Sequence, residues 1–307
     1  MTVTTKRLKR YPLRQSPFFR LRTRKKLCRH LGIPLNQMKA LASPDLNYRL
    51  WDVEKNGKTR HIESPTFPLK GVQSRIATLL SRIMPPDFLY CPTKGRSYLS
   101  NAAQHANSRV IHTLDIAEYF PSTPTERVKS FFRERMECSL DVAAILAALT
   151  TISGHLPTGG PASAILSYYA NDLMWLKISA LTKEAGCVLT VYMDDIAVSG
   201  DAVPNELLWN IRKLIRSSHL RYHKEKHFEN KVSEITGVII RDGILAVPNR
   251  HRLKAHTVRK EIQSARNRGE ARPLVRRLKG LEEVDRQLRL VNDHLVEQRN
   301  LTTDVGR

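Results

Sequence analysis

Two adjacent aspartates, Asp194 and Asp195, interrupt a largely apolar stretch of the chain at residues 188–200. β-Favouring residues flank them on both sides, so residues 188–193 and 196–199 are predicted to pair as an antiparallel hairpin with both aspartates at its tip. Two carboxylates held this close repel each other unless a cation lies between or beside them. A divalent metal ion would remove that cost.

A third carboxylate, Asp115, follows the apolar run of residues 110–114, which is also predicted to be a strand. A neighbouring strand of the same sheet could present this side chain to the hairpin tip. Three carboxylates suit two Mg²⁺ ions, which take oxygen ligands and keep open positions for phosphate oxygens. The aspartates therefore predict a two-metal phosphoryl-transfer site, and the alternative is an ordinary acidic surface turn.

Three further features in this order along the chain favour the catalytic interpretation over the surface turn. Phe120 carries a ring that could pack beneath a nucleotide sugar, and the Gly/Pro-rich turn at residues 156–163 opens a helix that suits close approach of a base pair or phosphate. Lys226 could protonate a leaving pyrophosphate. Each of these is, taken singly, more simply a core aromatic, a capped loop or a solvated lysine.

The composition indicates a polyanionic partner. The 307 residues include 51 Lys and Arg against 29 Asp and Glu, a formal charge of +22, so nucleic acid is the first candidate and an anionic membrane the second. The longest apolar run, residues 142–149, is too short to span a membrane, and the four cysteines have no C-x-x-C spacing. We therefore expect no membrane partner, no disulfide framework and a reducing cytosol.

The elements that must position these residues give an α+β pattern. A basic helix with Leu21, Leu27 and Leu31 on one face is expected first, then a strand hairpin over residues 48–64 with Asn56 and Gly57 in its turn. Helix-period segments are expected at residues 70–84, 125–136 and 162–185, with the strand that ends near Asp115 between the first two. From residue 248 the chain is basic and helix-like, with Gly269 and Pro273 predicted to separate two helices.

The motifs resemble those of the reverse transcriptase family over about residues 48–240. The most specific is YMDD at residues 192–195, and LDIAEYFPS at residues 114–122 resembles the family's first catalytic block. The resemblance implies that Asp115, Asp194 and Asp195 bind the metal ions and that the Ile116 carbonyl is a further ligand. It implies that Phe120 is the steric gate against a ribose 2′-hydroxyl.

Two finger-like blocks, at residues 58–65 and 69–73, extend this resemblance toward the N-terminus. By it, Arg60 and Lys70 would hold the incoming triphosphate. The Gly/Pro-rich turn departs from the family, since Thr158 stands where Gln is usual and Gly160 where Ala is usual. Met193 is the retroviral form of its motif, whereas retron enzymes more often have Ala there.

Two short elements resemble the retron branch of the family. Residues 100–105 read SNAAQH, similar to an Asn-Ala-x-x-His element, and residues 235–240 read ITGVII, similar to a Val-Thr-Gly element. The chemistry of Asn101 and His105 suits contact with RNA; the alternative is that Asn101 caps a helix and His105 packs in the interior. Residues 250–289 hold 13 Lys and Arg against 5 Asp and Glu, so Arg276 and Arg277 are expected to contact RNA phosphates.

The resemblance implies a right-hand polymerase fold. It would have a basic N-terminal segment and fingers at residues 1–107, a palm with an antiparallel sheet at 108–247, and a helical thumb at 248–307. The implied activity is RNA-templated DNA synthesis on a cognate structured noncoding RNA, giving branched RNA-linked single-stranded DNA (msDNA) from dNTPs. The implied setting is antiphage defence in a bacterial cytoplasm, with a separate effector protein and a host ribonuclease H.

Other functions remain open at this point. A group II intron-like or abortive-infection reverse transcriptase would share the three aspartates but not the two retron elements. A non-catalytic RNA-binding protein would explain the positive charge but not three acids placed together in a basic chain.

Overall fold

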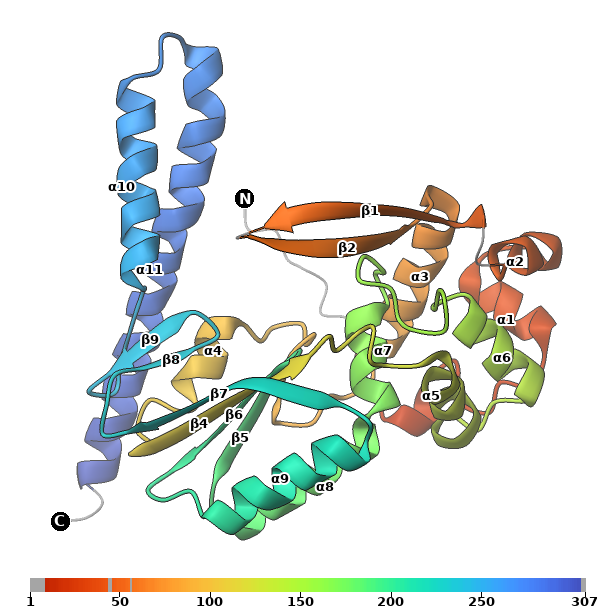
Figure 1. Ribbon diagram of the computed structural model, residues 1–307, viewed down its shortest axis with the longest axis horizontal. Helices are drawn as coiled ribbons and strands as arrows, with labels where there is room; N and C mark the ends of the chain where they lie inside the picture. The colour runs from red at the N-terminus through yellow and green to blue at the C-terminus, as the bar shows by residue number, and fades with distance from the viewer. Residues whose placement is uncertain (1–8, 44–45, 56, 305–307) are drawn as a thin grey trace. The chain divides into compact units, whose positions relative to one another are not determined.

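The computed structural model describes residues 9–43, 46–55 and 57–304, and for Lys55, Lys58 and residues 298–304 the backbone only. It divides into two compact units, each assembled from three segments of the chain. The first unit comprises Met1–Lys94, Ile116–Ala180 and Trp209–His223, and the second comprises Gly95–Asp115, Leu181–Leu208 and Lys224–Arg307. Both units mix helices with antiparallel strand pairs (Figure 1), which confirms the α+β class.

The first unit is mainly helical. Its elements are η1 (Leu13–Gln15), α1 (Arg24–Leu31), α2 (Leu35–Leu41), β1 (Tyr48–Lys55), β2 (Lys58–Pro65), α3 (Phe67–Leu80), β3 (Leu89–Cys91), α5 (Thr125–Ser130), the π-helical turn Phe131–Arg135, α6 (Leu140–Ala148), α7 (Ser163–Ala170), and most of α8 (Asp172–Glu184) and α9 (Asn205–Ser217). The predicted basic helix is α1, which begins after the N-cap Thr23, ends at Gly32 and buries Leu27 and Leu31.

The predicted strand hairpin of the first unit is present as β1 and β2. Their antiparallel register runs from Tyr48 opposite Pro65 to Lys55 opposite Lys58. Asn56, predicted in its turn, lies outside the described residues, as do the first eight residues of the chain.

The second unit contains the strands that carry the predicted acidic residues. Its elements are α4 (Tyr98–Ala103), most of β4 (Val110–Ala117), β5 (Val188–Tyr192), β6 (Asp195–Gly200), most of β7 (Arg221–Glu229), β8 (Ser233–Ile235), β9 (Val238–Arg241), β10 (Ile244–Ala246), α10 (Asn249–Gln263) and α11 (Arg268–Asp304). Neighbouring strands follow the order β5, β6, β4, β7, and a separate sheet has the order β10, β9, β8.

A single apolar cluster joins the two sheets of the second unit to α4 and α11. Helix α11 contributes apolar residues spaced by three or four positions, which form one face of a helix: Val284, Leu288, Val291 and Leu295. The cluster also includes Leu99 and Ala102 of α4 and Ile235, Val238 and Ile240 of the smaller sheet. The pair of helices α10 and α11 is therefore anchored at the C-terminal half of α11 (Figure 1).

The boundary between the last two helices differs from the prediction. Gly269 and Pro273 lie inside α11 and do not separate the helices. The break falls at residues 264–267, because Asn267 caps α11: its Oδ1 accepts a hydrogen bond from the Glu270 amide at 3.0 Å, and a Glu270 carboxylate oxygen accepts one from the Arg266 amide at 3.0 Å. The Asn-x-x-Glu spacing was a capping signal in the sequence.

Within the described part of the chain, none of the helices combines the length and the apolar character that crossing a bilayer requires.

Candidate active site

Strands β5 and β6 form the predicted antiparallel hairpin, but its turn falls one residue earlier than predicted, so Asp195 is the first residue of β6 and not part of the turn. Tyr192 pairs with Asp195, so Met193 and Asp194 form a two-residue turn. Met193 has a φ of 62°, in the left-handed region that two-residue hairpin turns require and that a side chain such as methionine rarely adopts. The backbone is thus held in an uncommon conformation directly beside the two aspartates.

The neighbouring strand β4 brings the third carboxylate to the same place. Asp115 is the direct cross-strand partner of Asp195. Like charges directly opposite each other on neighbouring strands are destabilising. Burial, together with the nearby Asp194 and Asp115 carboxylates, raises the pKa of Asp195 to about 6, against the opposing effect of Lys224 and Lys226. The fold therefore assembles acids at a cost in stability, which is typical of functional sites.

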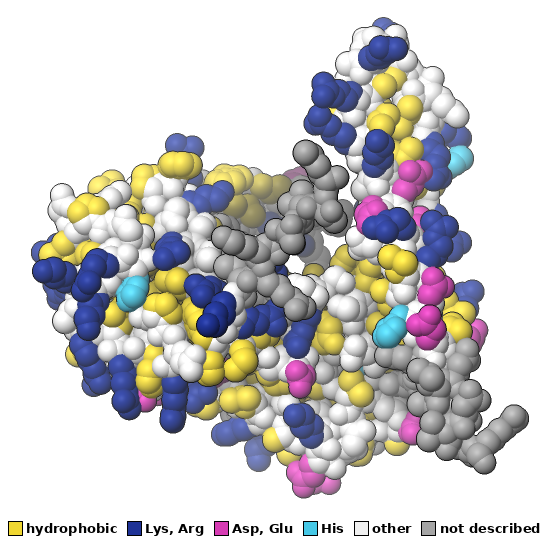
Figure 2. All heavy atoms as spheres, turned by 180° about the vertical axis from the view of Figure 1, so that it is seen from behind, with side chains coloured by type: hydrophobic (Ala, Val, Ile, Leu, Met, Phe, Trp, Pro, Cys, Tyr) yellow, Lys and Arg dark blue, Asp and Glu magenta, His cyan; other side chains and the backbone are white. Residues whose placement is uncertain are grey.

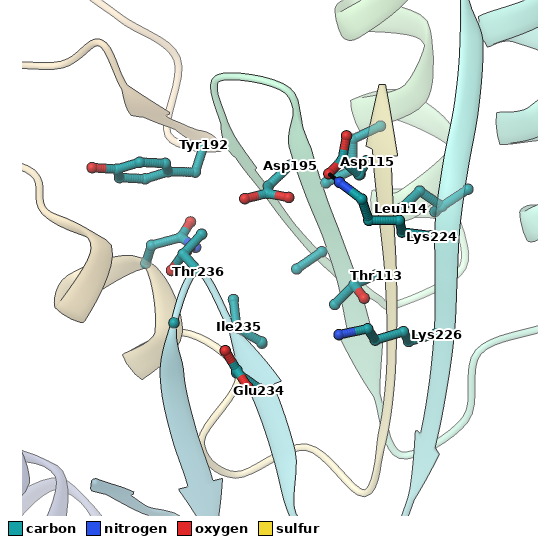
Figure 3. Close-up of a pocket in the computed structure, with 14 residues that line it drawn as sticks. Thr113, Leu114, Asp115, Tyr192, Asp195, Lys224, Lys226, Glu234, Ile235 and Thr236 are labelled. Atoms are coloured by element: carbon teal, nitrogen blue, oxygen red, sulfur yellow. Dashed lines mark hydrogen bonds and ion pairs between the residues drawn. The ribbon is translucent and has the colours of Figure 1, made fainter. Parts of the chain in front are cut away.

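Lysines of strand β7 face these acids. The Lys224 Nζ lies 2.7 Å from Asp115 Oδ2, and Lys226 extends from the same strand into the adjoining cavity (Figure 3). Sequence reasoning selected Lys226 and missed Lys224. The signal was present, because residues two apart on a strand lie on the same face.

A cavity of about 280 Å³ adjoins the acids and lies wholly within the second unit. Its walls come from strands β4, β5, β6 and β7, from α4, and from the turn between β8 and β9. The residues lining it are Asn101, Thr113, Leu114, Asp115, Tyr192, Asp195, Ile196, Ala197, Lys224, Lys226, Glu234, Ile235, Thr236 and Gly237. The Ile-Thr-Gly element noted in the sequence is thus part of the cavity wall (Figure 3).

The Asn-Ala-x-x-His element occupies the interior of the second unit. His105 is fully buried, with Nδ1 2.6 Å from Ser199 Oγ and Nε2 2.7 Å from Thr190 Oγ1. Burial lowers the pKa of His105 to about 3, so the ring is neutral. The interior position considered for His105 in the sequence is the one the structure has, and a direct contact of this ring with RNA would require its exposure.

Asn101 is 1% exposed and lies within α4. The capping role considered for it is wrong, because the N-cap is Ser97, whose hydroxyl accepts a hydrogen bond from the Ser100 amide. Asn101 is too deeply buried to contact RNA at the protein surface. Its side chain instead lines the cavity beside the acids.

The remaining predicted nucleotide-binding residues lie in the first unit. Arg60 on β2 and Lys70 on α3 are exposed. Phe120 is half-buried, and its ring stacks on Tyr119 with centroids 6.2 Å apart. Ile116, whose carbonyl was predicted as a metal ligand, follows Asp115 in β4 and has a buried side chain.

The unusual Thr158 has a defined role within the first unit. Its hydroxyl accepts a hydrogen bond from the Glu63 amide at 3.1 Å and donates one to the His61 carbonyl at 2.9 Å. The turn that departs from the family pattern is thereby attached to strand β2.

Arg276 and Arg277 are exposed neighbours on α11, but their surroundings differ. Arg277 lies 3.8 Å from Glu261 of α10, whereas Arg276 has no ion pair among the described side chains. Figure 2 shows Lys and Arg side chains distributed along this pair of helices. The two arginines are therefore not equivalent candidates for contact with phosphate.

The carboxylate oxygens of the three aspartates suit a divalent cation that takes oxygen ligands. Their negative charge would also be stabilised by such a cation. No cluster of three or more His, Cys, Asp or Glu side chains in the described residues is arranged to hold a metal ion. One reason is visible at Asp115, where the Lys224 ammonium occupies one side of the carboxylate. A metal ion that bound Oδ2 of Asp115 would have to displace that ammonium group.

Carboxylates grouped around two metal ions occur in polymerases, nucleases and phosphatases, so the grouped aspartates favour phosphoryl-transfer chemistry. No protein-family model matches the chain. Curated proteins do match it, among them three retron reverse transcriptases.

The Retron Se72 reverse transcriptase of Salmonella heidelberg is 31% identical over 220 residues, which cover 66% of this chain and 57% of the relative. The Retron Ec86 reverse transcriptase of Escherichia coli is 26% identical over 163 residues, covering 52% of this chain and 51% of the relative. The Retron Mx65 reverse transcriptase of Myxococcus xanthus is 28% identical over 195 residues, covering 57% and 44%.

The resemblance drawn from the motifs is thus confirmed, because the chain is similar in sequence to several curated retron reverse transcriptases. The chain spans about half the length of the curated relatives it matches.

Proposed function

We propose that this chain is a retron reverse transcriptase that copies its own structured noncoding RNA into branched, RNA-linked single-stranded DNA (msDNA) for antiphage defence. The observation that carries the proposal is the cross-strand pair Asp115 and Asp195, with Asp194 in the adjoining turn. This group of like charges lowers the stability of the fold. Three carboxylates of this kind suit two-metal nucleotidyl transfer.

In this proposal the three aspartates and the Ile116 carbonyl hold two Mg²⁺ ions. When bound, the ions would lower the pKa of the attacking hydroxyl and stabilise the charge on the leaving pyrophosphate. The Lys224 ammonium lies 2.7 Å from Asp115 Oδ2, and it would move toward the cavity if that oxygen bound a metal ion. Lys226, on the same face of β7, gives a proton to the pyrophosphate.

The other parts of the mechanism use side chains of the first unit. Arg60 and Lys70 bind the incoming dNTP triphosphate, and Phe120 excludes a ribose 2′-hydroxyl by its bulk. In the right-hand arrangement that we propose, residues 1–107 form the fingers, residues 108–247 the palm and residues 248–307 the thumb. Its partners are the cognate noncoding RNA, the DNA product, a separate effector protein and a host ribonuclease H in a bacterial cytoplasm.

The proposal is tested by extension of a DNA primer on an RNA template with dNTPs and Mg²⁺, combined with sequencing of the nucleic acid that copurifies with the protein. We expect Asp194→Asn to lower synthesis by at least about 100-fold while RNA binding survives, because the change removes a metal ligand and little surface. Asp201→Asn is the matched control, since Asp201 is an exposed aspartate that directly follows β6.

Equal synthesis by Asp194→Asn and the wild type would reject the metal site. RNA binding without any synthesis by the wild type would favour the non-catalytic RNA-binding alternative. Copurified DNA covalently joined to one RNA species would support the retron reaction over that of the other reverse transcriptases.

A further inference from the structure

Asn101 carries a buried polar atom that nothing in the described structure satisfies. The residue is 1% exposed, and its Oδ1 has no hydrogen-bond partner among the described residues. Its Nδ2 lies 3.4 Å from Thr236 Oγ1, a long contact. Whichever way the amide is turned, one of its two polar atoms remains without a partner. Such an atom costs folding free energy, so its presence calls for an explanation outside folding.

The helix that carries Asn101 is fixed to the strands of the active site. His105, four residues further along, bonds to Thr190 of β5 and Ser199 of β6. By strand alternation these two residues lie on the same face as Tyr192 and Asp195, which line the cavity. The distance between the Asn101 amide and the acidic tip is therefore set by a buried polar anchor.

The cavity offers polar groups on different sides. Asp115, Asp195 and the Lys224 ammonium group lie together on one side of the cavity, and Thr236, whose hydroxyl is 3.4 Å from the Asn101 amide, lies on another (Figure 3). Its volume of about 280 Å³ is at the small end for ligand pockets. It accommodates one nucleotide-sized group and not a duplex.

We propose that Asn101 is a specificity-determining contact for the nucleotide at the end of the growing strand, whose hydroxyl attacks at the carboxylates. Its amide oxygen accepts a hydrogen bond from that nucleotide, from either a sugar hydroxyl or an exocyclic amine of the base. This inference rests on the proposed polymerase function and names the substrate group that the cavity selects. We assign the strand end to the cavity because the attacking hydroxyl must lie at the carboxylates.

The assignment separates activity from stability in a way that a structural role would not. If Asn101 supported the fold, its replacement would lower the melting temperature. Because one amide atom has no partner in the described structure, Asn101→Ala should leave the melting temperature unchanged or raise it. Gln104→Ala is the matched control, since Gln104 is exposed at the end of the same helix.

The experiment compares the wild type and the Asn101→Ala variant on primers that differ in their last nucleotide. kcat/KM is measured for primers that end in guanosine, 2′-deoxyguanosine or inosine, the last of which lacks the exocyclic amine. We expect the wild type to prefer the primer with the recognised donor by about 3- to 10-fold, as one neutral hydrogen bond supplies. Asn101→Ala should lose that preference through KM, and Asn101→Ser, whose hydroxyl can accept, should keep part of it.

Loss of preference against the 2′-deoxy primer identifies a sugar hydroxyl, and loss against the inosine primer identifies the base amine. An equal fall on all three primers, or a preference unchanged in Asn101→Ala, overturns the inference. If the wild type extends none of the primers, the polymerase function itself fails. A last set of measurements varies the incoming nucleotide in place of the primer. If Asn101→Ala changes kcat/KM only for analogues of the incoming nucleotide, the assignment to the strand end is overturned.

Discussion

The acidic end of the larger sheet and the pair of helices α10 and α11 belong to the same compact unit but treat charge in opposite ways. At the sheet, Asp115 and Asp195 face each other across neighbouring strands, and the pKa of Asp195 is raised to about 6. On the helices, acids lie near arginines: Arg259 is 3.0 Å from Glu282, and Arg277 is 3.8 Å from Glu261.

The difference indicates that the acidic end of the larger sheet is arranged for activity at the expense of stability. Grouped like charges raise the free energy of the folded state, and a bound ligand of opposite charge would lower it. Interspersed surface charges contribute little either way, because solvent screens them. The first region should therefore respond to substitutions with gains in stability and loss of activity, and the second with changes in nucleic-acid binding alone.

The largest expected effect is at Asp195. In metal-free buffer at pH 8, we expect Asp195→Asn to raise the free energy of unfolding by up to about 3 kcal/mol, because a folded-state pKa of about 6 against an ordinary value of 3.8 penalises the charged form. The gain should disappear as the pH falls through 6 toward 4, where the native carboxyl is protonated. Denaturant unfolding followed by circular dichroism measures both.

Asp201→Asn is the control for this comparison, since the same chemical change is made at an exposed position after β6. A loss of stability in Asp195→Asn at pH 8 would show that the carboxylate supports the fold and that the contrast between the two regions is wrong.

A smaller effect on stability is expected at His105, whose ring bonds to Thr190 and Ser199 in the two strands of the acidic hairpin. The folded state keeps this histidine neutral, with its pKa lowered to about 3, whereas the unfolded chain takes up a proton near pH 6.5. Stability should therefore be lost as the pH falls from 7 to 5, by about 2 kcal/mol from this residue. The His105→Gln variant should be less stable than the wild type at pH 8, but its free energy of unfolding should change less between pH 7 and pH 5.

His256 provides the matched substitution in the other region, because it is an exposed histidine of α10. His256→Gln should follow the wild-type pH profile. Equal slopes for the wild type and His105→Gln would contradict the assignment of a neutral, buried ring.

The smallest expected effect separates two neighbouring arginines. Arg276→Gln should weaken binding to cognate and unrelated RNA alike, by a few-fold, and reduce the slope of log K against log salt by about 1, because one phosphate contact is lost. Arg277→Gln should change that slope less, since its guanidinium lies 3.8 Å from Glu261. Filter binding at several salt concentrations measures the slopes, and a larger change in Arg277→Gln would reverse the assignment.

The acidic hairpin could be predicted from sequence because its signals are local. Alternating β-favouring residues predicted two strands with Asp194 and Asp195 in the turn between them, and the turn lies one residue earlier, at Met193 and Asp194. The opposition of Asp115 and Asp195 needed one further assumption, that their strands are neighbours, and the register confirms it. Asp115 lies about 80 residues before Asp195, so no short-range pattern sets that register.

Other parts of the site depend on contacts that no local pattern encodes. The polar residues that hold His105 are Thr190 and Ser199, more than 80 positions away. A histidine in a short polar motif suggests a surface contact, and only the packing of α4 on the sheet makes it an interior anchor. The pairing of Lys224 with Asp115 likewise depends on the order of strands β4 and β7. In contrast, the start of α11 was readable from Asn267 and Glu270 and was missed.

Asn292 of α11 gives the edge of the smaller sheet a protection that the strands themselves lack. Strand β10 pairs with β9 on one side, and on its other side the Asn292 amide accepts a hydrogen bond from the Leu245 amide at 2.8 Å and donates one to the Leu245 carbonyl at 2.9 Å. One side chain thus imitates the backbone of an additional strand. An open edge is a template for aggregation between copies of a protein, so the helix that bears Arg276 and Arg277 also keeps this edge closed to strand addition by a second molecule.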